Sequence, residues 1–573
     1  MSENLYNDLS IKRKDLQAKG YIPEWFITPG LQLWEEKYEF NTETSVKGQF
    51  ERIARTAASH LPESIRQLAN DKFFELLWKG WLSPSTPVMS NMGTNKGLVV
   101  SCAGSVVEDS IDGFYSSLRE AALLTKYGFG TASYLGDIRP RGTPIAAGGK
   151  ASGVVPVFED FVNMTSKVTQ GTSRRGAWAG YLPISHGDFD ELVEHISANP
   201  DGANVGWNVY DNDLNKLNDG NQELSRRWKK SMKMKMVNGA GYYFFPDKAN
   251  RRVPEIYKKL GLTIKSSQLC NEIALASGID PTDNEKITFS CVLSSMNVAW
   301  YNDWKNTDAV YWATIFLDCV AEDFLQNAKN IKGLEQVVRF TERGRALGLG
   351  QCGIHTLFQE NSIPFESLDA HYLNMEIAEH IHKEANRASE YLAELLGEPL
   401  WCKGSGKRNT HIIAVAPTKS SALIQGGVSE GINPYPSNTY VQQTAAGEVN
   451  RVNPTLLKLM KDRNVYNDET LQSIVDNFGS VQQVDWLDEH EKKVFKTAFE
   501  IDQNILIRYA SNRARYIDQW QSVNLFFSAN ADPEYISSVH QKAFNDENIL
   551  GLYYIYSSAH DSSSAPVTCE SCQ

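Results

Sequence analysis

The sequence predicts an α/β fold built around a largely parallel sheet. Expected strands and helices alternate through most of residues 80–556, the order seen when helices connect neighbouring parallel strands. No repeat or low-complexity linker divides this stretch, so we expect one catalytic domain over residues 81–556. Residues 1–80 show only helical periodicity and are predicted to form an N-terminal helical domain.

The composition is that of an ordinary globular protein and argues against several classes of function. Of 573 residues, 42% are hydrophobic and 22% are charged, which allows a large core. A net charge of −12 argues against a broad nucleic-acid-binding surface. Acidic residues interrupt the most apolar helical run, 309–324, so no membrane span is expected. Eight cysteines without a signal peptide indicate a reducing, cytoplasmic compartment.

The individual elements follow from periodicity and turn chemistry. A buried strand at 97–103 carries Cys102, and a helix at 114–127 can be capped by Asp109 or Ser110. Further strands are expected at 286–295, 411–416, 523–527 and 551–556. Further helices are expected at 6–19, 46–60, 62–81, 309–328, 334–346, 367–396, 486–516 and 532–545.

Two loops rich in glycine and arginine, 136–154 and 170–178, suggest a nucleotide site. Glycine lets the backbone approach a ligand, and side chains such as Arg139 and Arg174 supply paired donors to phosphate. Solvated loops that carry stray charge are the alternative interpretation.

Two other segments resemble phosphate-binding motifs. Residues 348–353 match GxGxxG, but the preceding residues predict a helix ending in glycine where a dinucleotide fingerprint needs a strand, so we reject that match. The strand at 411–416 leads into residues 417–421, a hydroxyl-rich helix start. This segment could bind an anion through its N–H groups, or it could be a plain helix cap.

The cysteines provide the chemistry. If the chain is locally extended, Cys270 and Glu272 point to the same side, so that a nucleophilic or radical-carrying thiol lies beside a base. A buried structural cysteine is the alternative. We expect residues 557–573 to form a mobile, serine-rich tail with Cys569 and Cys572, which lack further zinc ligands nearby.

A tethered dithiol of this kind can exchange with a buried disulfide. The two strand-borne cysteines, Cys102 and Cys291, are the candidates for that disulfide. Cys319, Cys352 and Cys402 lack acidic or histidine neighbours at ligand spacing and are expected to fill the core.

In order and spacing, these segments resemble the catalytic large (alpha) subunit of class I ribonucleotide reductase over essentially the whole chain. The matching segments are Ser85–Met89, Ser101-Cys102, Asp109–Ile111, both glycine-rich loops, Leu269–Glu272, Cys291, Arg345–Gly350, residues 417–421, Tyr553-Tyr554 and the tail dithiol. The resemblance implies a ten-stranded α/β barrel of the ribonucleotide reductase and glycyl-radical type, with the Cys270 loop threaded through its centre.

The resemblance also implies a radical mechanism. Cys270, as a thiyl radical, would abstract the 3′-hydrogen of the ribose, and Glu272 would take the proton of the 3′-hydroxyl. Cys102 and Cys291 would supply the reducing equivalents as the 2′-hydroxyl leaves as water, and would end as a disulfide.

Partners are implied in the same way. Cys569 and Cys572 would reduce that disulfide and be re-reduced by a thioredoxin- or glutaredoxin-type protein. Tyr553 and Tyr554, expected as neighbours on one strand, resemble a radical relay from a ferritin-like, metal-containing small (beta) subunit. A homodimer is implied, and this chain itself is expected to bind no cofactor or metal.

Binding residues carry over by position. The resemblance implies substrate contacts, with a ribonucleoside diphosphate, from Thr86, Ser101, Gln268, Pro417, Thr418, Lys419, Ser420 and Ser421. It implies contacts to nucleoside triphosphate effectors (ATP, dATP, dTTP and dGTP), or relay of their identity, from Asp109, Ser110, Arg139, Gln170 and Arg174.

The sequence departs from the family pattern at three points. Gln268 stands where an asparagine is usual, and Lys419 stands where relatives often have a small or acidic residue. The residues before Thr86 read as scaffold helices where many relatives carry an N-terminal ATP cone. We therefore expect a short form in which dATP does not shut off activity through such a cone.

Three alternatives differ in mechanism or class. An adenosylcobalamin-dependent reductase would use the same cysteines but would need no tyrosine relay. A glycyl-radical enzyme is disfavoured because no glycine-radical motif lies near the C-terminus. A regulatory nucleotide-binding protein could keep the fold without the chemistry, but it would not need all five cysteines, Glu272 and both tyrosines.

Overall fold

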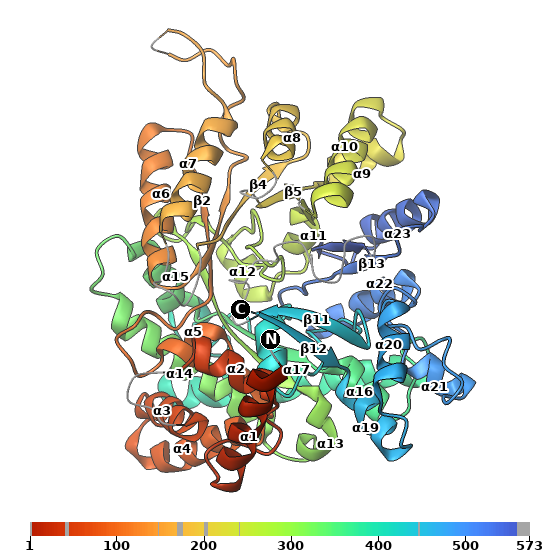
Figure 1. The fold of residues 1–573 in the computed structure, drawn as a ribbon. Helices are drawn as coiled ribbons and strands as arrows, with labels where there is room; N and C mark the ends of the chain where they lie inside the picture. Colours follow the sequence, from red (N-terminus) through yellow and green to blue (C-terminus); the bar gives the residue numbers. More distant parts are fainter. Residues whose placement is uncertain are drawn as a thin grey trace.

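In the computed structural model, the chain begins with helices that pack beside a central barrel (Figure 1). The structure describes residues 3–39, 45–146, 148–168, 176–199, 204–239, 241–444 and 447–557. The first helices are α1 (Glu3–Ala18), α2 (Thr28–Lys37), α3 (Val46–Ser59) and α4 (Glu63–Trp78). Three of them confirm the expected helices. The fourth, α2, was not predicted.

Five parallel strands form the first half of the barrel. They lie side by side in chain order as β2 (Cys102–Val106), β3 (Gly130–Tyr134), β4 (Trp178–Pro183), β5 (Asn204–Asn208) and β6 (Tyr242–Phe244). Parallel neighbours need long crossover connections. These carry helices α6 (Ile111–Lys126), α7 (Val154–Lys167), α8 (Phe189–Ala198), α9 (Asp211–Asn218) and α10 (Gln222–Asn238).

Five further segments form the second half. Strand β9 (Phe289–Asn297) pairs in parallel with β10 (Leu347–Cys352), whose Leu347 N–H donates to the carbonyl of His411. Residues 411–416 in turn bridge residues 519–527 through the parallel pair Val415 and Gln521. The last segment, 551–557, joins through parallel strands β13 (Leu525–Phe527) and β15 (Ile555–Ser557).

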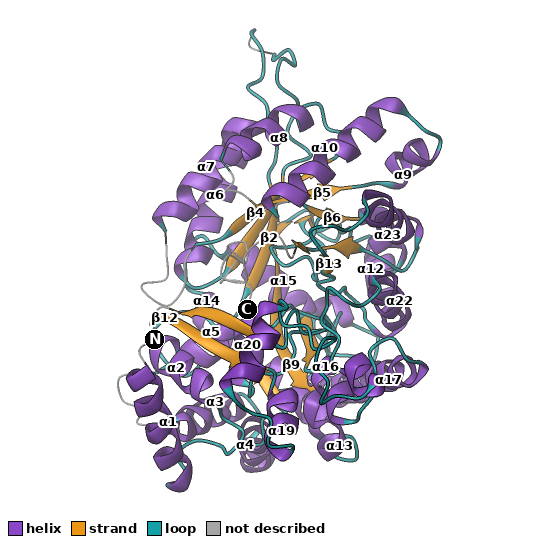
Figure 2. Cartoon of the chain, turned by 45° about the vertical axis from the view of Figure 1, so that its right-hand side comes forward, coloured by secondary structure: helices purple, strands orange, loops and turns teal. Residues whose placement is uncertain are grey.

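The two halves close on each other through antiparallel pairs. Strand β2 pairs with β9, and β6 pairs with β14 (Gly551–Leu552). Each half therefore contributes five segments to a closed ring, which confirms the expected ten-stranded barrel. In Figure 2 helices surround the strands of the barrel.

Several predicted elements differ in their boundaries. The strand expected at 97–103 begins only at Cys102, and residues 411–416 form a single bridge instead of a regular strand. The strand expected at 551–556 is split into β14 and β15. The helix expected at 486–516 is broken into α21 (Glu489–Val494) and α22 (Gln503–Arg513), with a short 3₁₀ turn at Ala514–Tyr516.

The remaining elements cover the barrel or extend from it. The long helices α14 (Ala309–Ala328), α15 (Glu335–Gly344) and α17 (Leu368–Leu396) agree with prediction. The shorter helices are α5 (Thr86–Asn91), α11 (Pro246–Arg251), α12 (Glu255–Leu260), α13 (Tyr301–Trp304), α16 (Ile354–Glu360), α18 (Lys419–Ile424), α19 (Pro454–Asp462), α20 (Asp468–Asp476) and α23 (Pro533–Asn545). The remaining strands are β1 (Leu82–Pro84), β7 (Gly278–Ile279), β8 (Lys286–Ile287), β11 (Thr439–Thr444) and β12 (Gly447–Val452).

None of the helices in the described ranges combines the length and hydropathy that a membrane span needs. In those same ranges, no group of three His, Cys, Asp or Glu side chains is arranged to hold a metal ion.

Candidate active site

A buried loop without regular structure connects the two halves of the barrel. Residues 266–277 are all buried and contain neither helix nor strand. Irregular backbone is costly to bury unless its polar groups find partners, and here both halves of the barrel supply them. From the first half, the Tyr181 hydroxyl on β4 donates to the carbonyl of Gln268 at 2.6 Å. From the second half, Trp520 N–H donates to the carbonyl of Glu272 at 2.9 Å.

Cys270 lies at the tip of a turn within this loop. Asn271 N–H donates to the carbonyl of Gln268 at 3.2 Å, and Asn271 adopts a φ of +65°. The condition of local extension, under which Cys270 and Glu272 would point to the same side, is therefore not met. The turn places residues 268 and 272 together instead, so that Gln268 Nε2 donates to Glu272 Oε2 at 2.6 Å.

Glu272 has the environment of a buried general base. Its Oε2 accepts from Gln268, and Ser522 Oγ lies 3.1 Å from the same oxygen. Its Oε1 is buried and has no hydrogen-bond partner among the described residues. Burial raises the pKa of Glu272 to about 7, although these hydrogen bonds oppose the shift. A carboxyl of this kind can take or give a proton near neutral pH.

Cys102 and Cys291 are directly opposite each other on antiparallel strands β2 and β9. Directly opposed antiparallel residues have Cα atoms about 4.5–5.5 Å apart, a separation that a disulfide can span. Both are buried thiols, and burial raises the pKa of Cys291 well above its ordinary value. The strand register therefore places the two cysteines within reach of a disulfide.

Two side-chain amides lie against the paired cysteines. Gln268 Nε2 is 3.9 Å from Cys102 Sγ, and Gln519 Nε2 is 3.6 Å from Cys291 Sγ. Gln268 therefore contacts both Glu272 and Cys102, so the longer amide at this position reaches the reactive groups. Gln519 and Ser522 were not expected at the site, because no motif marks them and they come from a segment about 230–250 residues away in the chain.

The absence of a side chain at Gly348 on β10 lets Leu293 and Cys291 pack closely against the backbone of this strand. A Cβ atom at Gly348 would lie 2.5 Å from Leu293 Cδ2 and 2.7 Å from Cys291 Sγ, so it would have to displace both side chains. Gly348 and Gly350 lie within β10, paired to β9, instead of in a turn leading into a helix. This position supports the rejection of a dinucleotide fingerprint.

We predict that Gly348→Ala lowers the free energy of unfolding by roughly 1–3 kcal/mol, because overpacking a filled core forces side chains from their preferred rotamers. Thermal denaturation measures the change. Gly48→Ala on α3 is the matched control, since its Cβ would meet nothing closer than Ser45 Oγ at 3.7 Å. Equal melting temperatures for the two variants would contradict the close contact.

Besides Gln268, the residues expected to bind substrate lie in three further segments. Thr86 begins α5, with Oγ1 3.0 Å from the Tyr38 hydroxyl. Ser101, next to Cys102, is buried, and its Oγ has no partner within the described ranges. Thr418 precedes α18 with a φ of +54°, and its Oγ1 accepts from Gly431 N–H at 2.7 Å.

The rest of the 417–421 segment differs in exposure. Pro417 and Ser421 are buried, Ser420 is half-buried, and Lys419 is exposed at the first position of α18. The predicted helix start is present, but no side chain caps it. Lys419 is therefore the member of this segment whose charge is accessible from outside.

The effector positions that the structure describes lie together at the start of α6. Asp109 forms an ion pair with Arg139, and Ser110 Oγ caps the helix by accepting from Gly113 N–H at 2.9 Å. Arg139 belongs to the glycine-rich loop between β3 and α7, which projects from the barrel in Figure 1. Gln170, Arg174, Cys569 and Cys572 lie outside the described residues.

Tyr553 and Tyr554 are adjacent and in contact, but they do not lie on one strand as predicted. They occupy the break between β14 and β15, with ring centroids 4.2 Å apart. Tyr553 N–H donates to the carbonyl of Val523, and Tyr554 N–H donates to Asn524 Oδ1. Hydrogen bonds to the neighbouring segment thus fix the irregular backbone of the pair.

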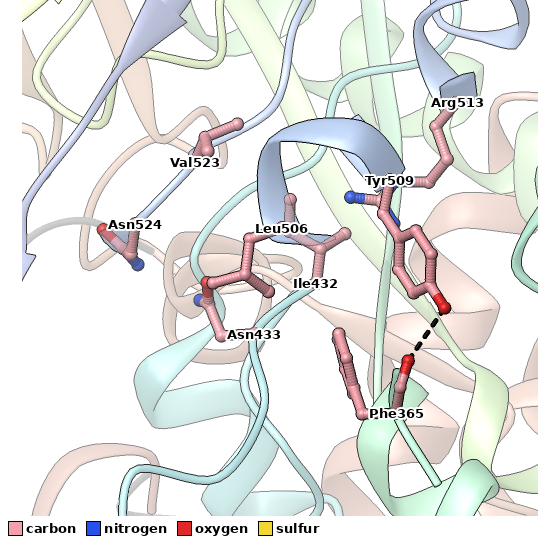
Figure 3. A pocket seen from close by; sticks show the side chains of 8 residues that line it. All are labelled: Phe365, Ile432, Asn433, Leu506, Tyr509, Arg513, Val523 and Asn524. Atoms are coloured by element: carbon pink, nitrogen blue, oxygen red, sulfur yellow. Dashed lines mark hydrogen bonds between the residues drawn. The ribbon is translucent and has the colours of Figure 1, made fainter. Parts of the chain in front are cut away.

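A small cavity borders the segment that supports the tyrosines (Figure 3). Its volume is about 10 Å³, the space of one water molecule, and its lining includes Asn524 and Arg513. Burial lowers the pKa of Arg513 to about 9. The cavity is far too small for a nucleotide and is not the substrate site.

Comparison with known families gives two matches along the chain. Residues 26–97 match the all-alpha domain of ribonucleotide reductase. Residues 100–203, 206–401 and 400–555 match its barrel domain.

Individual relatives agree with this match. A large-subunit sequence of ribonucleoside-diphosphate reductase from Frog virus 3 is 33% identical, covering 85% of this chain and 87% of the relative. The large subunit from Danio rerio is 28% identical over 84% of this chain and 69% of its own length. The solved alpha subunit of the class Id ribonucleotide reductase of Actinobacillus ureae is 34% identical with a TM-score of 0.85, and covers 95% of this chain and 99% of that one.

Proposed function

The chain belongs to the ribonucleotide reductase large-subunit family, and we propose that it reduces ribonucleoside diphosphates to 2′-deoxyribonucleotides with a radical carried on Cys270. The observation that supports this proposal most strongly is the cluster inside the barrel. Cys102 and Cys291 are opposed across two strands, and Gln268 contacts both Cys102 and the base Glu272.

The first steps use the buried loop. The Cys270 thiyl radical takes the 3′-hydrogen atom of the ribose and becomes a thiol, leaving a radical at C3′. Glu272 accepts the 3′-hydroxyl proton, for which its unpartnered Oε1 is available. Burial supports the radical step as well, because it keeps water from the reacting carbon.

The opposed cysteines complete the reduction. The 2′-hydroxyl leaves as water after accepting a proton from one thiol, and the hydrogen of the other thiol goes to C2′. Cys102 and Cys291 give up two electrons as they form a disulfide, and Glu272 returns its proton to the 3′-oxygen. Cys270 then returns its hydrogen to C3′ and is a thiyl radical again. For each turnover, one ribonucleotide and two thiols become one deoxyribonucleotide, one disulfide and one water.

The proposal extends to the partners of the enzyme. The tail dithiol Cys569 and Cys572 reduces the internal disulfide and is itself renewed by a thioredoxin- or glutaredoxin-type protein. A ferritin-like small subunit supplies the oxidising radical, which passes through Tyr554 and Tyr553 to Cys270. The 4.2 Å separation of the tyrosine rings is compatible with such a relay.

Nucleotide binding is proposed at two places. The substrate diphosphate lies at residues 417–421, where exposed Lys419 supplies charge, and the ribose lies beside Thr86 and Ser101. Triphosphate effectors (ATP, dATP, dTTP and dGTP) bind beside Asp109, Ser110 and Arg139, and the loop with Gln170 and Arg174 relays their identity in a homodimer.

We further propose that residues 1–80 are the helical domain, residues 81–556 the catalytic domain and residues 557–573 the tail, and that the enzyme acts in the cytoplasm.

The pH dependence of the reaction tests the role of Glu272. The base must be ionised, so we expect kcat to rise with pH through about 7 and then to level off. Glu272→Gln should lower kcat by roughly 10²-fold or more, because an amide cannot accept the proton. It should also abolish the rise of kcat with pH. Steady-state rates of deoxynucleotide formation between pH 5.5 and 8.5 measure both effects.

The same substitution should stabilise the fold above neutral pH. Burial raises the pKa of Glu272 above its ordinary value of 4.5, so the protonated form is favoured in the folded state. Stability is therefore lost as the pH rises from about 4.5 through 7, and the neutral amide escapes this loss. A Glu272→Gln variant that melts lower than the parent at pH 8 and keeps its kcat would contradict the assignment.

A further inference from the structure

A third tyrosine is packed against the Tyr553 and Tyr554 pair. Tyr242, the first residue of β6, has its ring centroid 4.8 Å from that of Tyr553 and 5.4 Å from that of Tyr554. All three side chains are buried. The three rings form one contiguous cluster, although Tyr242 lies more than 300 residues earlier in the chain.

The Tyr242 hydroxyl contacts the atom that a relay would oxidise. Its oxygen lies 3.1 Å from the Tyr554 hydroxyl oxygen, and it lies 3.1 Å from Asn204 Oδ1 on β5. A phenol has a single proton to donate, so Tyr242 can donate either to Asn204 or to Tyr554. A phenoxyl radical has lost its proton and can only accept, so an oxidised Tyr554 requires the second arrangement.

Lys235 on α10 fixes the backbone on both sides of this contact. Its buried amine donates to the carbonyl of Gly241, directly before Tyr242, at 2.6 Å, and it also donates to the carbonyl of Tyr553. Burial lowers the pKa of Lys235 to about 7. One side chain thus ties the start of β6 to the break between β14 and β15, and so holds Tyr242 against the pair.

We infer that Tyr242 is a positioning residue of the radical relay, whose hydroxyl orients Tyr554 and donates a hydrogen bond to its oxygen when Tyr554 is a radical. The inference rests on the proposed relay. When Tyr554 is oxidised, one electron and its phenolic proton leave to the radical-bearing small subunit, and Tyr242 keeps its own proton. Tyr553 then returns one electron and one proton to Tyr554, and in turn receives both from the Cys270 thiol.

The chain supplies a matched pair of variants for the test. Tyr242→Phe removes the hydroxyl that contacts Tyr554. Tyr243→Phe removes the hydroxyl of the next residue, which is equally buried but bonds to Ser231 Oγ at 2.7 Å. Both variants remove one buried, hydrogen-bonded hydroxyl, so a general loss of stability affects both.

The assay measures kcat, KM and the solvent deuterium isotope effect on kcat, with the large and small subunits together and a ribonucleoside diphosphate as substrate. We expect Tyr242→Phe to lower kcat about tenfold, the effect of losing about 1.4 kcal/mol of stabilisation. We expect KM to stay within about twofold and the isotope effect to increase, since hydrogen-bond loss acts on the transfer and not on substrate binding. Tyr243→Phe should change kcat by less than about twofold.

Three further variants decide the remaining outcomes. If Tyr242→Phe does not fold, a 3-fluorotyrosine at 242 keeps the ring and makes the hydroxyl a stronger donor. It should change kcat, whereas 3-fluorotyrosine at 243 should not. Tyr554→Phe separates the two proposals, because full activity in that variant would refute the relay itself. Inactive Tyr554→Phe together with unchanged Tyr242 variants would overturn only the role of Tyr242.

Discussion

Cys270→Ser should abolish deoxynucleotide formation, lowering turnover by roughly 10⁴-fold or more, the scale seen when an essential reacting group is removed. A serine hydroxyl holds its hydrogen too strongly to be converted by the relay into a radical that attacks the ribose. The substitution changes one buried atom at the tip of the loop, whose backbone is held by Ser522 Oγ at 2.7 Å from the Cys270 carbonyl. The fold and substrate binding should therefore persist.

The measurement pairs activity with binding. Product from ribonucleoside diphosphates is measured with the small subunit present, and equilibrium dialysis measures binding of the same substrates. Cys319→Ser is the matched control, because Cys319 is equally buried but lies on α14, outside the barrel interior. A Cys270→Ser enzyme with more than a few per cent of parental turnover would refute the thiyl mechanism. Loss of binding together with activity would point to a structural role.

Cys102→Ser and Cys291→Ser should each stop multiple turnover completely. Removal of either thiol leaves the opposed pair unable to form the disulfide that supplies two electrons. The tail variants Cys569→Ser and Cys572→Ser should behave differently. The tail variants should still complete one turnover, because the internal thiols are intact. A small dithiol such as dithiothreitol should partly restore further turnovers by exchanging directly with the internal disulfide.

Rapid quenching in the presence and absence of dithiothreitol distinguishes the two groups. We expect about one product per active site from the tail variants without the dithiol, because one internal disulfide is formed for each product. Cys352→Ser, at the end of β10, controls for the loss of a buried cysteine. Rescue of Cys291→Ser by dithiothreitol would contradict its role as an internal reductant.

The sequence predicted the elements whose pattern is local. Helix α14 was expected at 309–328 and has those bounds, because an apolar run of this length is too long for a strand. The barrel order followed from the family resemblance. Residues 411–416 are apolar and buried, as expected of a strand, but they pair irregularly with β10. The regularity of a strand depends on its pairing partners, which lie far away in the chain, so the local pattern could not reveal this difference.

The site could be predicted only in part for the same reason. The cysteines and Glu272 were singled out from their types and spacing, whereas the tyrosine pair was assigned only from the family resemblance. The turn at Cys270 was missed because it depends on hydrogen bonds to Tyr181 and Ser522, which other segments supply. Tyr242 gave no local signal either, since an isolated tyrosine at the start of a strand is usually part of the core.

The central claim is tested most directly by deoxynucleotide formation from the four ribonucleoside diphosphates. The reaction contains this chain, a dithiol reductant and the cognate small subunit, and parallel reactions replace the small subunit with adenosylcobalamin or with buffer. The account predicts product only when the small subunit is present. Product with adenosylcobalamin alone would leave the barrel chemistry in place but contradict the relay through Tyr553 and Tyr554. No product under any condition would contradict the proposed function.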